Sequence, residues 1–396
     1  QEDTGLNGFK KKEINHMQNG LFNVTEEQQG LVELIRDFMT KEIKPHVLEW
    51  EKEGHYPQEI IQQGIDRGLH MLQVPEEYGG MGLDTTTAAM MIEEGAKVES
   101  TFMGLFNVTS MGGKIVMAAG NEEQKQYYSG LLQKGYLSSF CLTEPDAGSD
   151  SAAVRTTAVR KGDSYVINGT KMFITNASLA SVFLVVATLD PSKGSKGLAT
   201  FIVERDRPGV TVGKKIDKIG MRLSNTAEVI FDNVEIPAFN LIGTEEGGFA
   251  NAMKVLTASR PIIAASSLGA CQLARDLAIQ YSKERVAFGK PICAKQMIQE
   301  KIANMEMLIQ AGRGLVYNAT MLLDQGKPCN KEASIAKCFV TEAFGKITDD
   351  ALQIFGGYGL CDEYLISKLY RDSRVNRIIE GTNEIQRVVI AKSLLR

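Results

Sequence analysis

One glutamate near the end of the chain has the surroundings of a general base. Glu380 stands between Ile379 and Gly381, and Gly381 interrupts a helical pattern that Thr382 or Asn383 can restart as a helix cap. Partial burial beside apolar residues raises the pKa of such a carboxyl toward neutrality, which suits proton abstraction. The N–H groups that open the new helix could also bind an oxyanion or a phosphate. Taken alone, the segment is more typical of a capping or surface glutamate.

Two further segments offer hydroxyl and aromatic side chains to a planar, polar ring. Within 140–150, a strand leads into a loop where the hydroxyls of Thr143 and Ser149 lie near backbone N–H groups. Further along, Phe173 and Thr175 are two residues apart, so on a strand they point to the same face. An ordinary β-turn and a hairpin with a phenylalanine in the core are the simpler alternatives.

A fourth segment places an arginine and an aromatic side chain at the end of a predicted helix. Arg285 and Phe288 are three residues apart, directly before Gly289. A guanidinium can bind an anion while the aromatic side chain contacts a ring. A solvated helix end with a glycine cap is equally typical of this segment.

Composition narrows the class of protein. The chain has 396 residues, with 44 Lys and Arg against 48 Asp and Glu, a formal charge of −4. This mildly acidic balance disfavours a general nucleic-acid binder, and 43% hydrophobic with 23% charged residues excludes disordered and collagen-like classes. Six cysteines without a CxxC pair favour a reducing compartment, and four histidines confined to the first fifth of the chain argue against a metal site.

Missing motifs narrow the chemistry further. No GxGxxG, GxxxxGK[ST], HExxH or GxSxG motif occurs, so a Rossmann dinucleotide site, a phosphate-binding loop, a zinc protease and a nucleophile elbow are unsupported. An uncharged run at 172–189 holds several polar residues, and we interpret it as a turn and a buried strand rather than a membrane span. An enzyme of this sequence must therefore use another cofactor-binding fold or a carboxylate base.

The elements that must position these residues fall into three parts, which predict an α+β fold that is mainly α. Residues 1–22 are polar and are expected to form a mobile extension, and 23–137 follow helical spacing after a capping box at Thr25. Short β-rich runs alternate with turns over 138–245, which is typical of a compact barrel or sandwich. Long apolar stripes at helical spacing over 246–396 indicate a helix bundle.

Six motifs in order along the chain resemble the acyl-CoA dehydrogenase family of flavoproteins. The similarity covers nearly the whole chain from about residue 23, and the motifs lie at 74–80, 143–150, 168–176, 285–291, 353–359 and 380–386. Each motif alone is weak or moderate, whereas all six in order outweigh the simpler interpretations. The resemblance implies a helical N-terminal domain, a middle β-barrel and a C-terminal four-helix bundle, with tightly bound FAD in a homotetramer.

The resemblance also implies roles for individual residues. Glu380 matches the catalytic base of the family, whereas Ser259, near which some relatives carry that base, cannot serve as one. The implied FAD contacts are Phe140, Leu142, Thr143, Ser149, Phe173, Thr175, Arg285, Phe288, Gln353, Gly357, Thr382 and Glu384. Among these, Arg285 and Phe288 would reach the FAD of a neighbouring subunit. The implied substrate contacts are Ser149, Arg260 and Gly381, and no metal is expected.

The implied reaction converts an acyl-CoA thioester to a trans-2-enoyl-CoA. Glu380 takes the α-proton, a hydride passes to flavin N5, and electron-transferring flavoprotein receives the electrons. An enoyl-CoA reductase working in the reverse direction in an anaerobe would use the same residues. A non-catalytic flavin-binding or scaffold protein is the alternative of another class.

The resemblance leaves the substrate open. Ile379 stands where many relatives carry Tyr, and the region around Phe106 and Asn107 is expected to shape the acyl pocket. We expect a soluble protein of the bacterial cytoplasm or the mitochondrial matrix, with no nucleic-acid partner and no membrane span.

Overall fold

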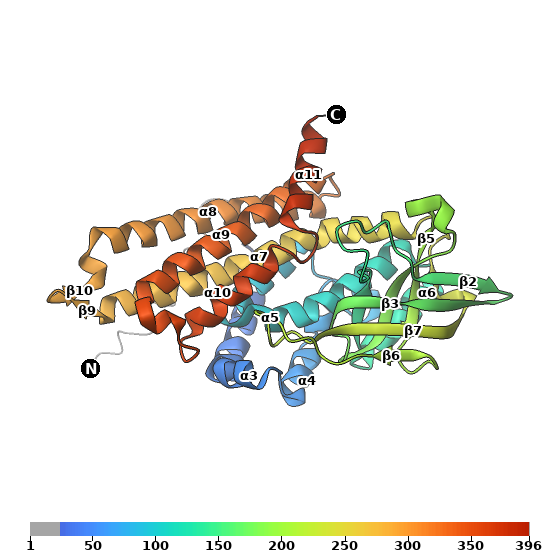
Figure 1. Cartoon of the computed structure of the whole chain (residues 1–396), viewed down its shortest axis with the longest axis horizontal. Helices are drawn as coiled ribbons and strands as arrows, with labels where there is room; N and C mark the ends of the chain where they lie inside the picture. Colours follow the sequence, from blue (N-terminus) through green and yellow to red (C-terminus); the bar gives the residue numbers. More distant parts are fainter. Residues whose placement is uncertain (1–23, 396) are drawn as a thin grey trace.

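The computed structural model describes residues 24–395, so the extension expected at 1–22 lies outside the described residues. The described chain begins with a helical part, coloured blue to teal in Figure 1. The Thr25 hydroxyl accepts from the Gln28 N–H while the Gln28 side chain accepts from the Thr25 N–H, which confirms the predicted capping box. The α-helices of this part are α2 (Glu26–Phe38), α3 (Val47–Glu53), α4 (Gln58–Asp66), α5 (Thr85–Ala119) and α6 (Glu122–Gln133).

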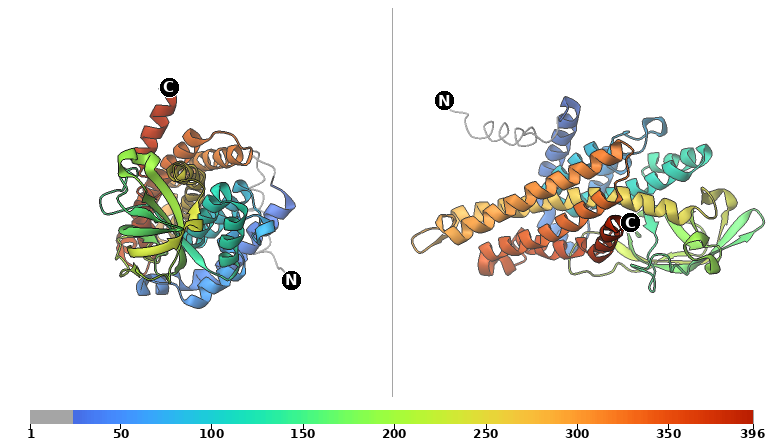
Figure 2. Two further views of the ribbon diagram at one scale, coloured as in Figure 1. Left: turned by 90° about the vertical axis from the view of Figure 1, so that its right-hand side faces the viewer. Right: turned by 90° about the horizontal axis from the view of Figure 1, so that it is seen from above.

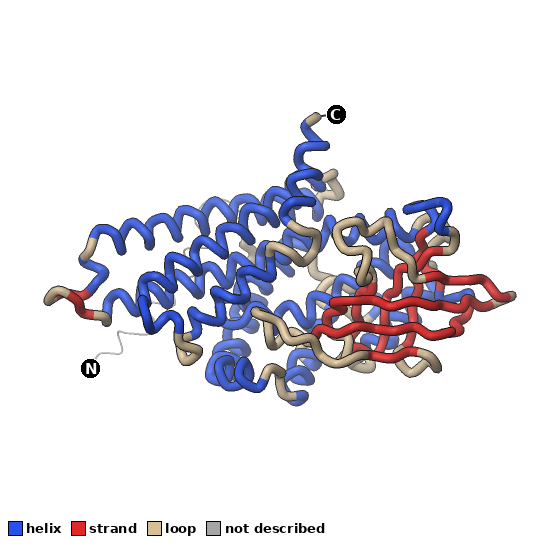
Figure 3. Tube along the Cα trace, in the orientation of Figure 1, coloured by secondary structure: helices blue, strands red, loops and turns tan. Residues whose placement is uncertain are grey.

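The middle of the chain forms one eight-stranded sheet, the large red element in Figure 3. Its strands are β1 (Leu137–Cys141), β2 (Thr157–Lys161), β3 (Ser164–Thr175), β4 (Ala180–Thr188), β5 (Leu198–Glu204), β6 (Val210–Val212), β7 (Thr226–Pro237) and β8 (Leu241–Ile242). They lie in the order β6-β7-β3-β2-β4-β5-β8, and β1 pairs in parallel with β4. Apolar residues of β3, β4, β5 and β7 enclose one core. Other residues of β4 and β5 pack on α5 and α6, which explains why β4 is buried along almost its whole length.

The last part of the chain is a bundle of long helices. Helix α7 (Gly248–Glu284) leads through the hairpin β9 (Val286–Ala287) and β10 (Lys290–Pro291) into α8 (Gln296–Asp324), α9 (Asn330–Phe355), α10 (Leu365–Asn376) and α11 (Asn383–Leu394). Helices α7, α8 and α9 run side by side in Figures 1 and 2. The fold is therefore mainly helical α+β, as predicted.

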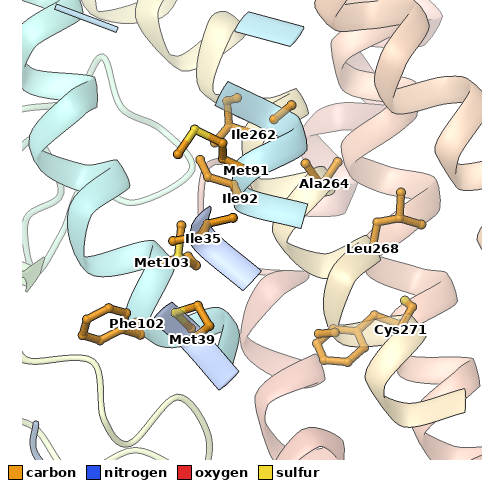
Figure 4. Close-up of a cluster of buried hydrophobic side chains, with 14 of the residues drawn as sticks. Ile35, Met39, Met91, Ile92, Phe102, Met103, Ile262, Ala264, Leu268 and Cys271 are labelled. Atoms are coloured by element: carbon orange, nitrogen blue, oxygen red, sulfur yellow. The ribbon is translucent and has the colours of Figure 1, made fainter. Parts of the chain in front are cut away.

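Helix α7 lies at the centre of this arrangement. Among the described residues it is the one helix that is long and apolar enough to cross a membrane, but 67% of its most apolar stretch is buried, so it is a core helix. Figure 4 shows the core that it shares with the N-terminal helices. There Ile35 of α2, Met91 and Phe102 of α5, and Ile262 and Leu268 of α7 are at most 4% exposed. Burial of such side chains contributes about 1.5–3 kcal/mol each and fixes the helices relative to one another.

Helix α5 consists of two helical stretches joined at a break. Glu99 is extended, with φ −154° and ψ 102°, although neither glycine nor proline lies beside it. Its carboxylate is 2.9 Å from the ammonium of Lys368 in α10 and accepts from the Thr101 N–H at 2.9 Å. The break is thus stabilised by a buried charge from the other end of the chain.

Candidate active site

Glu380 lies in a tight turn between α10 and α11. Its φ is +57° and that of Gly381 is +85°, so two successive residues are left-handed, a conformation that non-glycine residues seldom adopt. Thr382 ends the turn by accepting from the Ile385 N–H and capping α11, as predicted. Because the left-handed glutamate carries an energetic cost, neighbouring groups must hold it in place.

The carboxylate of Glu380 meets side chains from other helices. Ser259 of α7 is 2% exposed and donates from Oγ to Glu380 Oε2 at 2.5 Å. Burial raises the pKa of Glu380 above its ordinary value, while the Ser259 hydrogen bond and the charges of Lys337, Arg260 and Lys114 act in the opposite direction. Since burial is the largest effect, Glu380 is a better proton acceptor than an exposed glutamate.

Two buried cations accompany this carboxylate. Arg260, predicted as a substrate contact, donates to the side chains of Asn330 and Ser334 at 2.8 and 3.2 Å, while its Nε has no partner among the described residues. Lys337 is fully buried, which lowers its pKa to about 8. Sequence reasoning missed Lys337, because it lies within an apolar helical stripe more than forty positions before Glu380.

The hydroxyl and aromatic residues of the β-rich segments come together where β1 and β3 end. Thr143 follows β1, and its carbonyl accepts from the Met172 N–H at 2.8 Å, so this loop lies against β3. On β3, Ile174 is 2% exposed, whereas Phe173 is 61% exposed and Thr175 is half-buried. Phe173 and Thr175 are therefore both more exposed than Ile174 between them, as expected for two residues on one face of a strand. Phe173 is nevertheless left-handed (φ +58°), at a shift in the β3–β7 register.

A buried ion pair fixes the loop that carries Thr143. Lys171 Nζ lies 2.7 Å from the Glu144 carboxylate, and the two side chains are 0% and 5% exposed. Lys171 also donates to the Leu142 carbonyl at 3.2 Å, and Glu144 accepts from two backbone N–H groups further along the chain. Both sequence neighbours of Thr143 are therefore anchored, and this anchor was not predicted.

The other predicted residues of this region either pack in an apolar cluster or lie at the surface. Phe140 and Leu142 belong to an apolar cluster with Val186 and Leu198. Ser149 is exposed on the loop after Thr143. The structure thus brings Phe140 and Leu142 to the base of the loop and leaves Ser149 at its surface.

A cleft of about 470 Å³ lies at the hairpin end of the helix bundle, and its lining includes Tyr281, Arg285, Phe355, Gly357 and Tyr358. The Arg285 guanidinium carbon is 5.6 Å from the ring centroid of Tyr358, and the rings of Tyr281 and Phe355 stack with centroids 4.2 Å apart. A Cβ on Gly357 would meet no atom within 4 Å, so the backbone is open to a ligand. Aromatic rings, a guanidinium and open backbone together suit a nucleotide with its phosphates.

Four predicted contacts lie outside this cleft. Phe288 is left-handed (φ +53°) at the tip of the β9–β10 hairpin and is 94% exposed. Gln353 is exposed on α9 and is not part of the lining. Thr382 and Glu384 begin α11 beside Glu380. The structure therefore brings Arg285 and Gly357 together, and leaves the remaining four on other surfaces.

The hairpin beside the cleft and the sheet that carries Thr175 lie on opposite sides of the helix bundle. Figure 1 shows the β9–β10 hairpin at the left end and the sheet with β3 at the right end. The helix bundle lies between the β9–β10 hairpin, which directly follows Arg285, and the sheet, whose strand β3 ends at Thr175.

Three family models match the chain in succession. They are the acyl-CoA dehydrogenase N-terminal domain at 25–135, the middle domain at 139–234 and the C-terminal domain at 246–395. Together they span nearly all of the described chain.

Individual proteins are similar over the same length. An acyl-CoA dehydrogenase of Bacillus subtilis is 44% identical over 375 residues, which are 94% of this chain and 99% of that protein. A 3-(aryl)acrylate reductase of Clostridium sporogenes is 42% identical over 94% of this chain and 99% of its own length. The solved structure of butyryl-CoA dehydrogenase from Megasphaera elsdenii has a TM-score of 0.92 at 39% identity, covering 95% of this chain and 100% of that chain.

Proposed function

The chain belongs to the acyl-CoA dehydrogenase family, oxidoreductases that act on CH–CH groups, and on that premise we propose that Glu380 is its catalytic base. The observation that carries this proposal is the half-buried, left-handed Glu380, whose pKa is raised by desolvation while Ser259 donates to its carboxylate. A carboxylate in this state accepts the α-proton of a thioester more readily than an exposed one.

The backbone N–H of Glu380 can stabilise the negative charge that forms when the α-proton leaves. An α-proton is acidic only when the developing enolate oxygen is stabilised by hydrogen-bond donors. Within residues 24–395, the N–H of Glu380 donates to no protein acceptor. It is therefore available to the thioester carbonyl, so one residue can take the proton and stabilise the resulting charge.

We also propose that the chain binds FAD. Its residues fit the two ends of this cofactor: Thr143, Phe173 and Thr175 offer hydroxyls and an aromatic side chain to the flavin ring. Arg285 and Gly357 line a cleft whose rings, charge and open backbone suit the adenosine and pyrophosphate. When bound, FAD would supply the acceptor for the hydride that leaves the β-carbon.

The placement of these two groups supports a site shared between copies. Because the helix bundle separates the β9–β10 hairpin from the sheet, we propose that a second copy supplies Arg285 and Gly357 to the FAD whose ring contacts the first. A two-fold arrangement would complete two such sites at once. This is consistent with a homotetramer built from such pairs, as the family resemblance implies.

Two similarities bear on substrate and direction. The similarity to butyryl-CoA dehydrogenase supports a short-chain acyl-CoA substrate. The similarity to 3-(aryl)acrylate reductase keeps the reverse reaction as the second candidate, in which protonated Glu380 would return the proton to the α-carbon. The electrons must enter or leave after each turnover, and electron-transferring flavoprotein is the proposed partner. All six cysteines are free thiols, which fits the reducing interior of a bacterium or a mitochondrion.

A visible absorption spectrum with a panel of thioesters tests this proposal. We expect a yellow protein with one FAD per chain, bleached by butyryl-CoA and, to differing extents, by longer or aryl-substituted acyl-CoAs. Butyrate without CoA is the matched control and should leave the spectrum unchanged. A colourless protein that cannot be reconstituted with FAD would contradict the cofactor, and a yellow protein that no acyl-CoA bleaches would favour a non-catalytic flavoprotein.

A further inference from the structure

Two side chains from different helices meet the backbone of the turn that carries Glu380. Lys337 of α9 donates from Nζ to the Gly381 carbonyl at 2.9 Å. Gln386 of α11 donates from Nε2 to the same carbonyl at 2.9 Å and reaches the Glu380 carbonyl at 3.4 Å. One carbonyl oxygen thus accepts from both, next to the two left-handed residues.

Both donors are themselves held in place. Lys337 and Gln386 are 0% exposed, and Lys337 also donates to Asn383 Oδ1 at 2.9 Å. Asn383 is 2% exposed and in turn donates to Thr341 Oγ1 at 3.0 Å. A Cβ on Gly381 would lie 2.8 Å from Gln386 Nε2, so the glycine permits this close contact. The donors therefore form part of a rigid buried network rather than a surface contact.

We propose that Lys337 and Gln386 are positioning residues for the reaction. By binding the Gly381 carbonyl together, they fix the left-handed turn and so aim the carboxylate and the N–H of Glu380. This inference rests on the proposed role of Glu380 as the base. Neither residue touches the reacting atoms, and each acts through the backbone of the turn.

The charge of Lys337 gives it a second effect that Gln386 lacks. Its ammonium lowers the pKa of Glu380, together with Arg260 of α7, Lys114 of α5 and the Ser259 hydroxyl. The charged or titratable groups that face Lys337 are Glu380, Cys338, Arg260 and Glu384. Removing the ammonium must therefore raise the pKa of Glu380, whereas removing Gln386 leaves these charges unchanged.

The test compares Lys337→Met with Lys346→Met in the FAD-loaded, full-length enzyme. Lys346 lies on the same helix, but its side chain is 61% exposed. The readouts are the kcat and KM of flavin reduction, their pH profile, and exchange of the acyl-CoA α-proton with D₂O followed by NMR. For Lys337→Met we expect kcat and the exchange rate to fall by about 10²-fold, as for a misplaced reacting group. KM should change far less, and the acid limb of the profile should move to higher pH.

For Lys337, a purely structural role would lower the rate without moving the acid limb. Values of kcat and limb position like those of Lys346→Met would overturn the inference. Where Lys337→Met yields no soluble holoenzyme, Gln386→Met carries the test: kcat and α-proton exchange per bound FAD should fall while KM and the acid limb stay in place, and Gln386→Glu, which retains an acceptor but not the donor, should not rescue kcat. Wild-type kcat, or a loss that follows only the loss of FAD-loaded protein, would overturn the inference. Glu380→Gln in the same assay separates a failure of the proposed function from a failure of this inference. An active Glu380→Gln enzyme defeats the proposed function, whereas an inactive one beside unaffected Lys337 and Gln386 variants defeats this inference alone.

Discussion

Ser259 donates a hydrogen bond to Glu380 at 2.5 Å although the two residues are 121 positions apart in the sequence. The bond joins the central helix α7 to the turn before α11, and it links a buried serine to a half-buried glutamate. A hydroxyl that donates to a carboxylate stabilises its charged form and lowers its pKa. Ser259 is thus not a base, but it tunes the group that we propose as one.

Replacing Ser259 with alanine should shift the pH dependence of the reaction. Without the donated hydrogen bond, the pKa of Glu380 should rise further, so the acid limb of flavin reduction should move to higher pH. The control is Ser282→Ala, which removes a buried hydroxyl of the same helix that bonds only within it. An unchanged limb in Ser259→Ala would show that the bond does not tune Glu380.

The wild-type enzyme should itself titrate above the ordinary carboxyl range. Burial raises the pKa of Glu380 from its usual value near 4.5, and only the carboxylate can accept the α-proton. The rate of flavin reduction by acyl-CoA should therefore rise with pH through this raised pKa. Reduction of an enoyl-CoA by the reduced enzyme should instead fall as pH rises, because it needs the protonated acid. Stopped-flow profiles from about pH 5 to pH 9 test both directions, and parallel slopes would refute the assignment.

Arg285→Ala should weaken FAD retention and subunit association together. The guanidinium lines a cleft beside the β9–β10 hairpin, which the helix bundle separates from the sheet, so we propose that its bonds to a pyrophosphate cross between copies. FAD content after gel filtration and the mass of the assembly measure the two effects. Lys290→Ala, an exposed residue of the same hairpin, is the matched control. Full retention of both FAD and assembly in Arg285→Ala would argue against a shared site.

Lys368→Met should be strongly destabilising. Lys368 lies 2.9 Å from Glu99 and 2.6 Å from Asp372, with all three side chains at most 2% exposed. Removing the ammonium leaves two buried carboxylates unpaired, which should lower the free energy of unfolding by about 3–5 kcal/mol. Denaturant unfolding at one fixed protein concentration measures this change.

The control for that experiment is an exposed ion pair of the same residue types. Lys41 and Asp37 are 3.9 Å apart, with side chains 71% and 68% exposed. Lys41→Met should therefore change the free energy of unfolding by less than about 1 kcal/mol. Equal effects of the two substitutions would mean that the Lys368 cluster does not stabilise the break in α5.

Local signals in the sequence predict the turn at Glu380 well. Gly381 and Thr382 directly follow Glu380 in the sequence, and each favours a turn or a helix start by its own residue type. In the structure Gly381 is left-handed and Thr382 caps α11. Ser259 and Lys337 could not be predicted in the same way, because they lie on helices whose spacing indicates only burial. Their meeting at Glu380 depends on how α7, α9 and the turn pack together.

Two features of the fold differ from what the sequence predicts. The apolar spacing of residues 86–98 fits one helix, but it does not predict that α5 resumes after a break at Glu99, because the partner of that residue is the distant Lys368. The segment after Arg285 is consistent with a glycine cap from sequence alone. It forms a two-residue hairpin turn instead, in which Phe288 and Gly289 are both left-handed (φ +53° and +74°).

The central claim is that Glu380 takes the α-proton, and stopped-flow bleaching of the Glu380→Gln enzyme tests it most directly. Glutamine keeps the size and much of the hydrogen bonding, so FAD and acyl-CoA should still bind, but it cannot accept the proton. With an acyl-CoA that bleaches the wild type, we predict a rate lower by about 10²–10⁴-fold or more. Glu380→Asp should retain part of the activity, because the base survives about one methylene out of position. Bleaching of the glutamine enzyme at a rate near that of the wild type would contradict the account and place the base elsewhere.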